Sequence, residues 1–149
     1  MVTTNLLESL LRKAGFELAH HQVARFWKIP EALQQTPCDF MGFTNTGRAI
    51  LIEAKQVQGT SLSIGKRTNG LQPHQYLALK EANKAGALAF VLWANGDECA
   101  QMSFDMVRVF AEYRRSIPWR EIQKKFVRPF NDRIDPLSLL DVWLPTPTP

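Results

Sequence analysis

The stretch DFMGFTNTGRAILIEAK, residues 39–55, constrains the fold more than any other part of the chain. Its pattern predicts two β-strands joined by the short turn Asn45-Thr46-Gly47. A three-residue hairpin loop commonly holds its third residue in the left-handed region, which glycine adopts without strain. With these three residues as the loop, the register of the strands places Asp39 directly opposite Glu53.

Side chains along a strand alternate between the two faces of a sheet, so Lys55 shares a face with Glu53 and Asp39. The opposite face is apolar and holds Phe40, Ile50, Ile52 and Ala54. A bulge at the turn would shift this register by one residue. Like charges that face each other directly across two strands are destabilising, so the acid pair requires a neighbouring positive charge.

Two readings of the acid pair are open. In one, a divalent cation lies between the carboxylates, and hard oxygen ligands suit Mg²⁺ or Mn²⁺. Such a metal activates water and stabilises a phosphoryl transition state, and Lys55 would position the water and stabilise developing negative charge. In the other, the hairpin carries a solvated acid pair, because a pattern as short as D-x13-E-x-K often arises by chance. The apolar strand beside the acids and the shared face favour the metal site.

Composition sets broad limits. A length of 149 residues fits one domain, which we expect to span residues 1–144, with the PTPTP end at 145–149 as a disordered tail. The net charge of +4 permits a polyanionic partner without demanding one. No apolar run is long enough to span a bilayer, and no secretory signal is visible. Cys38 and Cys99 form no metal-binding spacing, which favours a reduced, cytoplasmic protein.

The hydrophobic pattern predicts an α/β fold with a mixed β-sheet flanked by helices. Helices are expected over residues 5–14 with a stop at Gly15, then over 71–85, 104–115, 118–127 and 135–143. Strands are expected within 16–27, in the hairpin, and over 87–93 and 99–102. Residues 30–35 are expected to form a helical turn, and residues 56–70 a polar, mobile loop.

Asp39 followed by Glu53-Ala54-Lys55 resembles the PD-(D/E)xK nuclease superfamily, and within it the RecU-type Holliday junction resolvases. Three further stretches resemble that family: GTSLSIGKRTNGLQPHQ, RRSIPWREI and RIDPLSLLD. The resemblance covers most of the chain from Pro37 onward. It implies a restriction-endonuclease-like core and a Mg²⁺-dependent (or Mn²⁺-dependent) endonuclease that cuts four-way junctions in branched DNA. A junction is two-fold symmetric and needs two coordinated cuts, so a homodimer is expected.

The resemblance also implies roles for single residues. Asp39 and Glu53 would hold the metal, Lys55 would serve catalysis, Gln75 would lie at the catalytic site, and Glu8 would be a third metal ligand. Gln75 could instead be an ordinary surface amide. Glu8 could instead form a capping box with Asn5 at the start of the first helix. Basic and polar residues are candidates for contacts to the DNA backbone, which give affinity without sequence information; they are Lys66, Arg67, His74, Arg114, Arg115, Lys124 and Lys125.

The chain departs from the family pattern at two places. Cys38 stands where the family often has threonine, which removes any support that a hydroxyl gives the metal site, unless the thiol faces the core. The interval 22–36 is short, so the family's protruding stalk must be reduced.

Two other functions therefore stay open: a related nuclease acting on linear or flapped duplex DNA, and a non-catalytic DNA-binding module. The small size suits a phage-encoded version, acting in the nucleoid or in the cytoplasm of an infected host.

Overall fold

A computed structural model describes residues 6–30, 38–65 and 70–145 of the chain. Six strands form one mixed sheet in the order β1-β2-β3-β5-β6-β8. They are β1 (Ala24–Lys28), β2 (Phe40–Thr44), β3 (Ala49–Gln56), β5 (Leu88–Asn95), β6 (Glu98–Ser103) and β8 (Val127–Pro129). Among the described strands of this sheet, only β3 and β5 pair in parallel, and the crossover between them carries a helix, the usual connection between parallel strands. A second, two-stranded sheet pairs β4 (Ser61–Ser63) with β7 (Ser116–Pro118).

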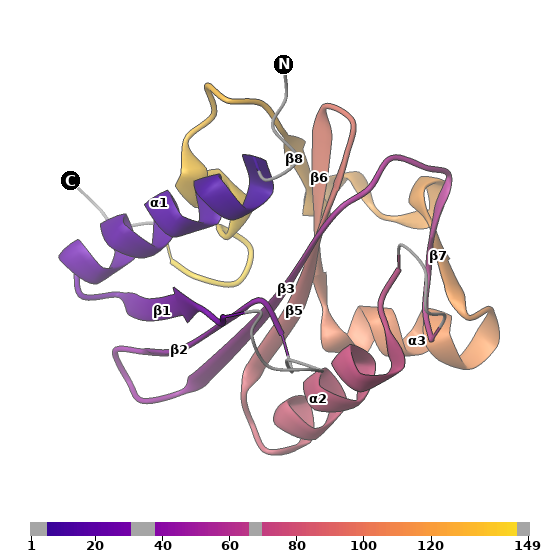
Figure 1. Cartoon of the computed structure of the whole chain (residues 1–149), viewed down its shortest axis with the longest axis horizontal. Helices are drawn as coiled ribbons and strands as arrows, with labels where there is room; N and C mark the ends of the chain where they lie inside the picture. Colours follow the sequence, from indigo (N-terminus) through magenta and orange to yellow (C-terminus); the bar gives the residue numbers. More distant parts are fainter. Residues whose placement is uncertain (1–5, 31–37, 66–69, 146–149) are drawn as a thin grey trace.

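Helices cover both faces of the large sheet (Figure 1). The helix α1 (Leu6–His20) packs on one face, together with the C-terminal segment that holds the 3₁₀ turn η3 (Pro136–Leu139). The helices α2 (Pro73–Lys84) and α3 (Phe104–Tyr113) pack on the other face with the small sheet. Two further 3₁₀ turns, η1 (Trp119–Glu121) and η2 (Lys124–Phe126), lie between β7 and β8. This arrangement confirms the predicted α/β fold, in which a mixed sheet is flanked by helices.

The predicted hairpin register is confirmed. Phe40 pairs with Ile52 and Met41 with Leu51, which sets Asp39 opposite Glu53. Gly47 has a φ of 86°, and its N–H donates to the carbonyl of Thr44. The predicted faces are also correct, because the apolar set of Phe40, Ile50 and Ile52 packs against α1.

Several other helices and strands lie close to the positions predicted from the hydrophobic pattern of the sequence. The helix α2 ends just before Gly86, whose φ is 96°, and the continuously apolar strand β5 is covered on both faces. The strand β6 and the helix α3 fall within two residues of their predicted positions. The strand expected within residues 16–27 is β1, which begins at Ala24.

The predicted stop at Gly15 is wrong, because α1 continues to His20. Gly15 is buried under the ring of Phe26, and a Cβ there would lie 3.1 Å from Cε1 of that ring. The glycine therefore serves close packing between helix and sheet rather than helix termination.

Three further predictions, one of a loop and two of helices, are also wrong. The polar stretch 56–70 contains the strand β4, whose Leu62 is buried against Ile117 of β7. Residues 118–127 form two 3₁₀ turns instead of a helix, because the chain is held by pairing at β7 and at β8 on either side. The predicted helix over 135–143 is only the 3₁₀ turn η3 followed by turns.

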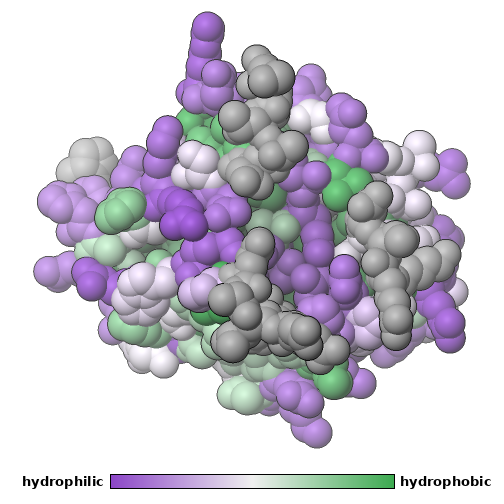
Figure 2. Space-filling model, viewed as in Figure 1, coloured by the Kyte–Doolittle hydropathy of each residue, from purple (hydrophilic) through white to green (hydrophobic). Residues whose placement is uncertain are grey.

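The predicted tail and the helical turn at 30–35 lie largely outside the described residues. On the face shown in Figure 2, hydrophilic residues predominate and apolar ones form separate small groups. Within the described part of the chain, no helix combines the length and apolar character needed to cross a bilayer.

Candidate active site

The site is built where β2 begins and β3 ends. Asp39 immediately precedes β2, and its N–H donates to the carbonyl of Ile52, which continues the ladder to the acid itself. Oδ2 of Asp39 accepts the N–H of Ala54 at 2.8 Å, which fixes the carboxylate against β3. Glu53 and Lys55 lie on either side of that contact along the strand. The backbone ladder alone therefore brings two acids and a lysine together.

Glu53 is one of the most unusual side chains of the protein, since it is a carboxyl group with only 1% exposure. Nζ of Lys55 lies 3.4 Å from its Oε1. Its Oε2 is buried and has no hydrogen-bond partner among the described residues. Burial raises the pKa of Glu53 to about 9, the charge of Asp39 adds to the rise, and the ammonium of Lys55 opposes it.

These observations fit a divalent cation at the two acids. A buried carboxylate oxygen without a partner is costly, and a cation between the acids would remove both this cost and their repulsion, as protonation of Glu53 does in the metal-free protein. Mg²⁺ is commonly held by one or two carboxylates, with waters and substrate phosphates as its other ligands. The described residues contain no cluster of three or more acidic, histidine or cysteine ligands, so Asp39 and Glu53 would form the protein's share.

Gln75 holds the lysine in place. It lies in the first turn of α2, and its Oε1 accepts a hydrogen bond from Nζ of Lys55 at 2.9 Å. The same oxygen accepts the N–H of Gln72 at 3.0 Å, in the manner of a capping box. The start of α2 is thus tied to β3 through one amide oxygen, and the ammonium has a defined position between Glu53 and Gln75.

Lys28 is a residue that the sequence did not single out. It ends β1, and its Nζ lies 4.0 Å from Oδ1 of Asp39 and donates to the carbonyl of Ile29 at 2.9 Å. Its side chain is only 11% exposed. The only signal that could have found it is the pairing of β1 with β2, which is a contact between segments far apart in sequence.

Cys38, the residue before Asp39, is buried beside the two acids. Its thiol is buried and donates to the carbonyl of Phe40 at 3.1 Å. Burial raises the pKa of the thiol to about 12, and the charges of Glu53 and Asp39 add to the rise. The thiol is therefore neutral at ordinary pH and serves as a packed hydrogen-bond donor beside the acids.

The structure does not bring Glu8 into this group. It lies in the first turn of α1, and its carboxylate pairs with Arg12 at 3.0 Å. The start of α1 is nevertheless close to the end of β3, because the N–H of Leu7 donates to Oε1 of Gln56 at 2.9 Å. Asn5, the other half of the predicted capping box, lies outside the described residues.

The candidate DNA contacts are spread over the chain. Lys66 and Arg67 lie outside the described residues. His74 is half-buried in the first turn of α2, beside Gln75. The remaining candidates lie on later elements: Arg114 pairs with Glu121, Arg115 follows α3 with a φ of 54°, and Lys124 and Lys125 are in η2, next to β8. The strand β8 is three positions from β3 in the sheet.

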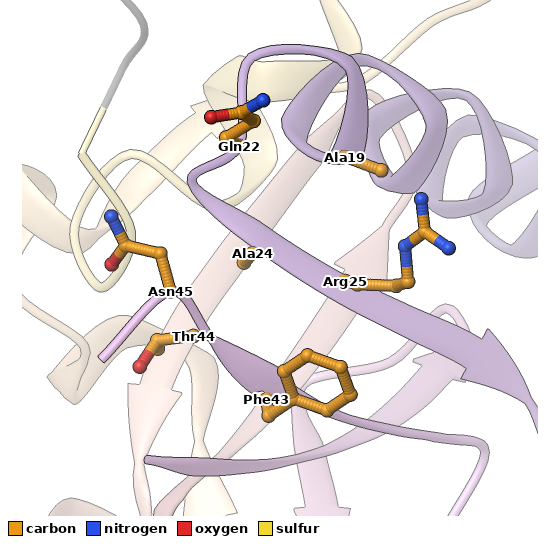
Figure 3. Close-up of a pocket in the computed structure, with 7 residues that line it drawn as sticks. All are labelled: Ala19, Gln22, Ala24, Arg25, Phe43, Thr44 and Asn45. Carbon is orange, nitrogen blue, oxygen red and sulfur yellow. The ribbon is translucent and has the colours of Figure 1, made fainter. Parts of the chain in front are cut away.

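A cavity of about 230 Å³ opens elsewhere, between the end of α1 and the far end of the β1–β2 pair. Ala19, Arg25, Phe43 and Asn45 are among its lining residues (Figure 3). It is mostly apolar and holds none of the acids, so it is separate from the candidate active site.

Comparisons with known proteins complete the description. Among the curated proteins, none matches the sequence significantly. A Holliday junction resolvase, Hjc of the archaeal hyperthermophile Archaeoglobus fulgidus, shares 19% sequence identity with the chain at a TM-score of 0.45, over 66% of this chain and 77% of that one. The model of the family described as RecU, Recombination protein U, matches residues 12–142. That match spans most of the sequence and includes Asp39, Glu53 and Lys55. The chain therefore belongs to the RecU family of Holliday junction resolvases, which are endonucleases.

Proposed function

We propose that this resolvase hydrolyses phosphodiester bonds with Mg²⁺ or Mn²⁺ held between Asp39 and Glu53. The buried, unpartnered Oε2 of Glu53 opposite a second carboxylate is the observation that carries the proposal. The ion would supply Lewis-acid chemistry, which activates water and neutralises charge on the phosphoryl group. The N–H of Ala54 donates a hydrogen bond to the carboxylate of Asp39 and so holds it in position for this role.

Lys55 would position the attacking water and stabilise the negative charge that develops on the phosphoryl group. Its ammonium is already held between Glu53 and Gln75, so little reorganisation is needed when substrate arrives. Lys28, on the other side of Asp39, would add a second positive charge for the substrate phosphate. Gln75 is a positioning residue in this scheme, and Glu8 would join as a further metal ligand only through a rearrangement of its pair with Arg12.

The substrate symmetry implies two copies of the chain, because a four-way junction must be cut at two symmetric positions. We therefore propose a homodimer, with residues 1–144 as one nuclease domain in each copy. Lys66, Arg67, His74, Arg114, Arg115, Lys124 and Lys125 are proposed backbone contacts. The place of action would be the nucleoid, or the cytoplasm of an infected host for a phage-encoded version.

The test compares cleavage of a synthetic four-way junction with cleavage of a linear duplex of the same arm sequence, in Mg²⁺, in Mn²⁺ and in EDTA. We expect paired cuts in the junction with either metal, weak cutting of the duplex, and no cutting in EDTA. Equal rates on both substrates would instead indicate a nuclease for linear DNA. Binding without cleavage in either metal would indicate a non-catalytic module.

A further inference from the structure

Three large apolar side chains are exposed on the β1–β2 pair. Trp27, Met41 and Phe43, here called the hairpin patch, are 52%, 36% and 46% exposed. Trp27 pairs with Met41 across the two strands, and the rings of Trp27 and Phe43 lie 5.8 Å apart. Exposed apolar groups that adjoin one another mark binding surfaces far more often than isolated ones do.

The hairpin patch lies on the sheet face that carries the active site. Met41 is opposite Leu51, which is two residues before Glu53 on β3, and side chains two apart share a face. Asp39, Met41 and Phe43 likewise alternate along β2. At about 3.4 Å per residue, the patch extends from roughly 7 to roughly 14 Å beyond Asp39.

The surroundings explain why this part of the face is open. The helix α2 packs with the buried residues of β3 and β5, whereas α1 covers β1 and β2 from the opposite face. Figure 1 shows β1 and β2 at one end of the sheet, away from α2 and α3. Among the described helices, none covers the hairpin patch.

The charge around the hairpin patch is positive. Arg25 pairs with Phe43, and both side chains line the cavity (Figure 3). Lys28 ends β1 at the end of the strand pair nearer Asp39, and Arg48 lies between β2 and β3. Residues 23–30 and 40–52 contain no acid at all. A polyanion fits this setting, whereas two identical copies of the patch would bring like charges together.

We propose that the hairpin patch stacks against bases exposed at the branch point of the DNA junction. Aromatic side chains bind any base through its π-face, but in a linear duplex the base faces are covered by their neighbours. A branch point leaves base faces uncovered. One strand of a duplex rises ~3.4 Å per nucleotide along the helix axis, so the patch reaches about two to four nucleotides of axial rise from the scissile phosphate. The inference rests on the proposed function, and it assigns the recognition of branching to this surface.

The test measures binding in EDTA, so that cleavage cannot interfere, with 2-aminopurine placed at the branch point. Trp27→Ala and Phe43→Ala should each weaken junction binding on the order of tenfold and reduce the change in 2-aminopurine fluorescence. Binding to a linear duplex should stay unchanged. Trp27→Phe should retain most of the affinity, because it keeps a stacking ring. Phe16→Ala is the matched control, since Phe16 is 80% exposed but lies on α1.

The outcomes separate this inference from the nuclease assignment. The inference would be overturned if Trp27→Ala and Phe43→Ala bound the junction as tightly as the native protein does. It would also be overturned if they lost affinity for the linear duplex to the same extent as for the junction. Both results hold even if the native protein cleaves junctions. Variants that become monomeric while the native protein is a dimer would also overturn it, in favour of a second copy as the occupant. Branch-point quenching by a native protein that never cleaves would support the patch while removing the nuclease function.

Discussion

The ammonium group of Lys28 lies 4.0 Å from Oδ1 of Asp39, so the candidate active site has a lysine beside each of its two acids. Lys28 comes from β1 and Lys55 from β3, on opposite sides of β2. An ammonium at this distance contributes charge stabilisation both to the acid and to any phosphate bound there.

Lys28→Gln should lower the cleavage rate by about tenfold or more, because a phosphoryl transition state gains charge that the lysine offsets. The Mg²⁺ concentration that gives half-maximal rate should stay the same or fall, because a competing cation is removed from Asp39. Cleavage rates over a Mg²⁺ series measure both effects. Lys80→Gln, an exposed change on α2, is the control. A large rise in the Mg²⁺ requirement would show instead that Lys28 supports metal binding.

Gln75→Ala should lower the cleavage rate on the order of tenfold, since Lys55 loses the acceptor that fixes its ammonium. Gln75→Glu should retain most of the rate, because a carboxylate oxygen also accepts a hydrogen bond from the ammonium. Rescue by this conservative variant distinguishes positioning of Lys55 from simple loss of structure. Unchanged rates in Gln75→Ala would remove Gln75 from the site.

The stability of the metal-free protein should fall as pH rises. The pKa of Glu53 is about 9 in the folded chain, against its ordinary value of 4.5. Between these values the folded state holds a proton that the unfolded state has lost, so the free energy of unfolding decreases with increasing pH. Melting temperatures in EDTA from about pH 6 to about pH 8.5 measure this trend.

Glu53→Gln should flatten that pH dependence, because an amide has no proton to lose in this range. Added Mg²⁺ should raise the melting temperature of the native protein more at the higher pH, since its ligands must be deprotonated. A melting temperature in EDTA that increases over the same range would contradict the raised pKa of Glu53.

Gly42→Ala should destabilise the fold by roughly 3 kcal/mol or more. A Cβ at this position would lie 1.9 Å from the carbonyl oxygen of Arg25, so β1 could not keep its pairing with β2. Urea unfolding measures the loss. Gly59→Ala is the matched control, because a Cβ there meets its nearest neighbour at an ordinary 3.6 Å. Similar stability of both variants would show that β1 can shift without cost.

The site was predictable where its geometry is local. The turn at Gly47 sets the hairpin register, and the register alone decides that Asp39 faces Glu53 and shares a side with Lys55. Gln75 could be expected only through the resemblance to the family, since it reaches Lys55 from another element. Lys28 was missed for the same reason, because nothing near it in sequence indicates that β1 pairs beside Asp39.

The errors in the fold have the same origin. Gly15 reads as a helix stop until the ring of Phe26 is known to lie against it. Residues 118–127 have an amphipathic pattern, but pairing of Ile117 with Leu62 and of Val127 with Ala100 holds the chain at both ends. In each case a contact with a distant segment overrides the local preference.

Metal binding by the protein alone is the strongest test of a cation shared by Asp39 and Glu53. Titration with Mn²⁺, followed by calorimetry or by the electron paramagnetic resonance of the free ion, should show binding by the native protein. Asp39→Asn and Glu53→Gln should each weaken this binding by about tenfold or more while leaving the fold intact. Mn²⁺ affinity that is the same in both variants as in the native protein would contradict a cation shared by these two carboxylates.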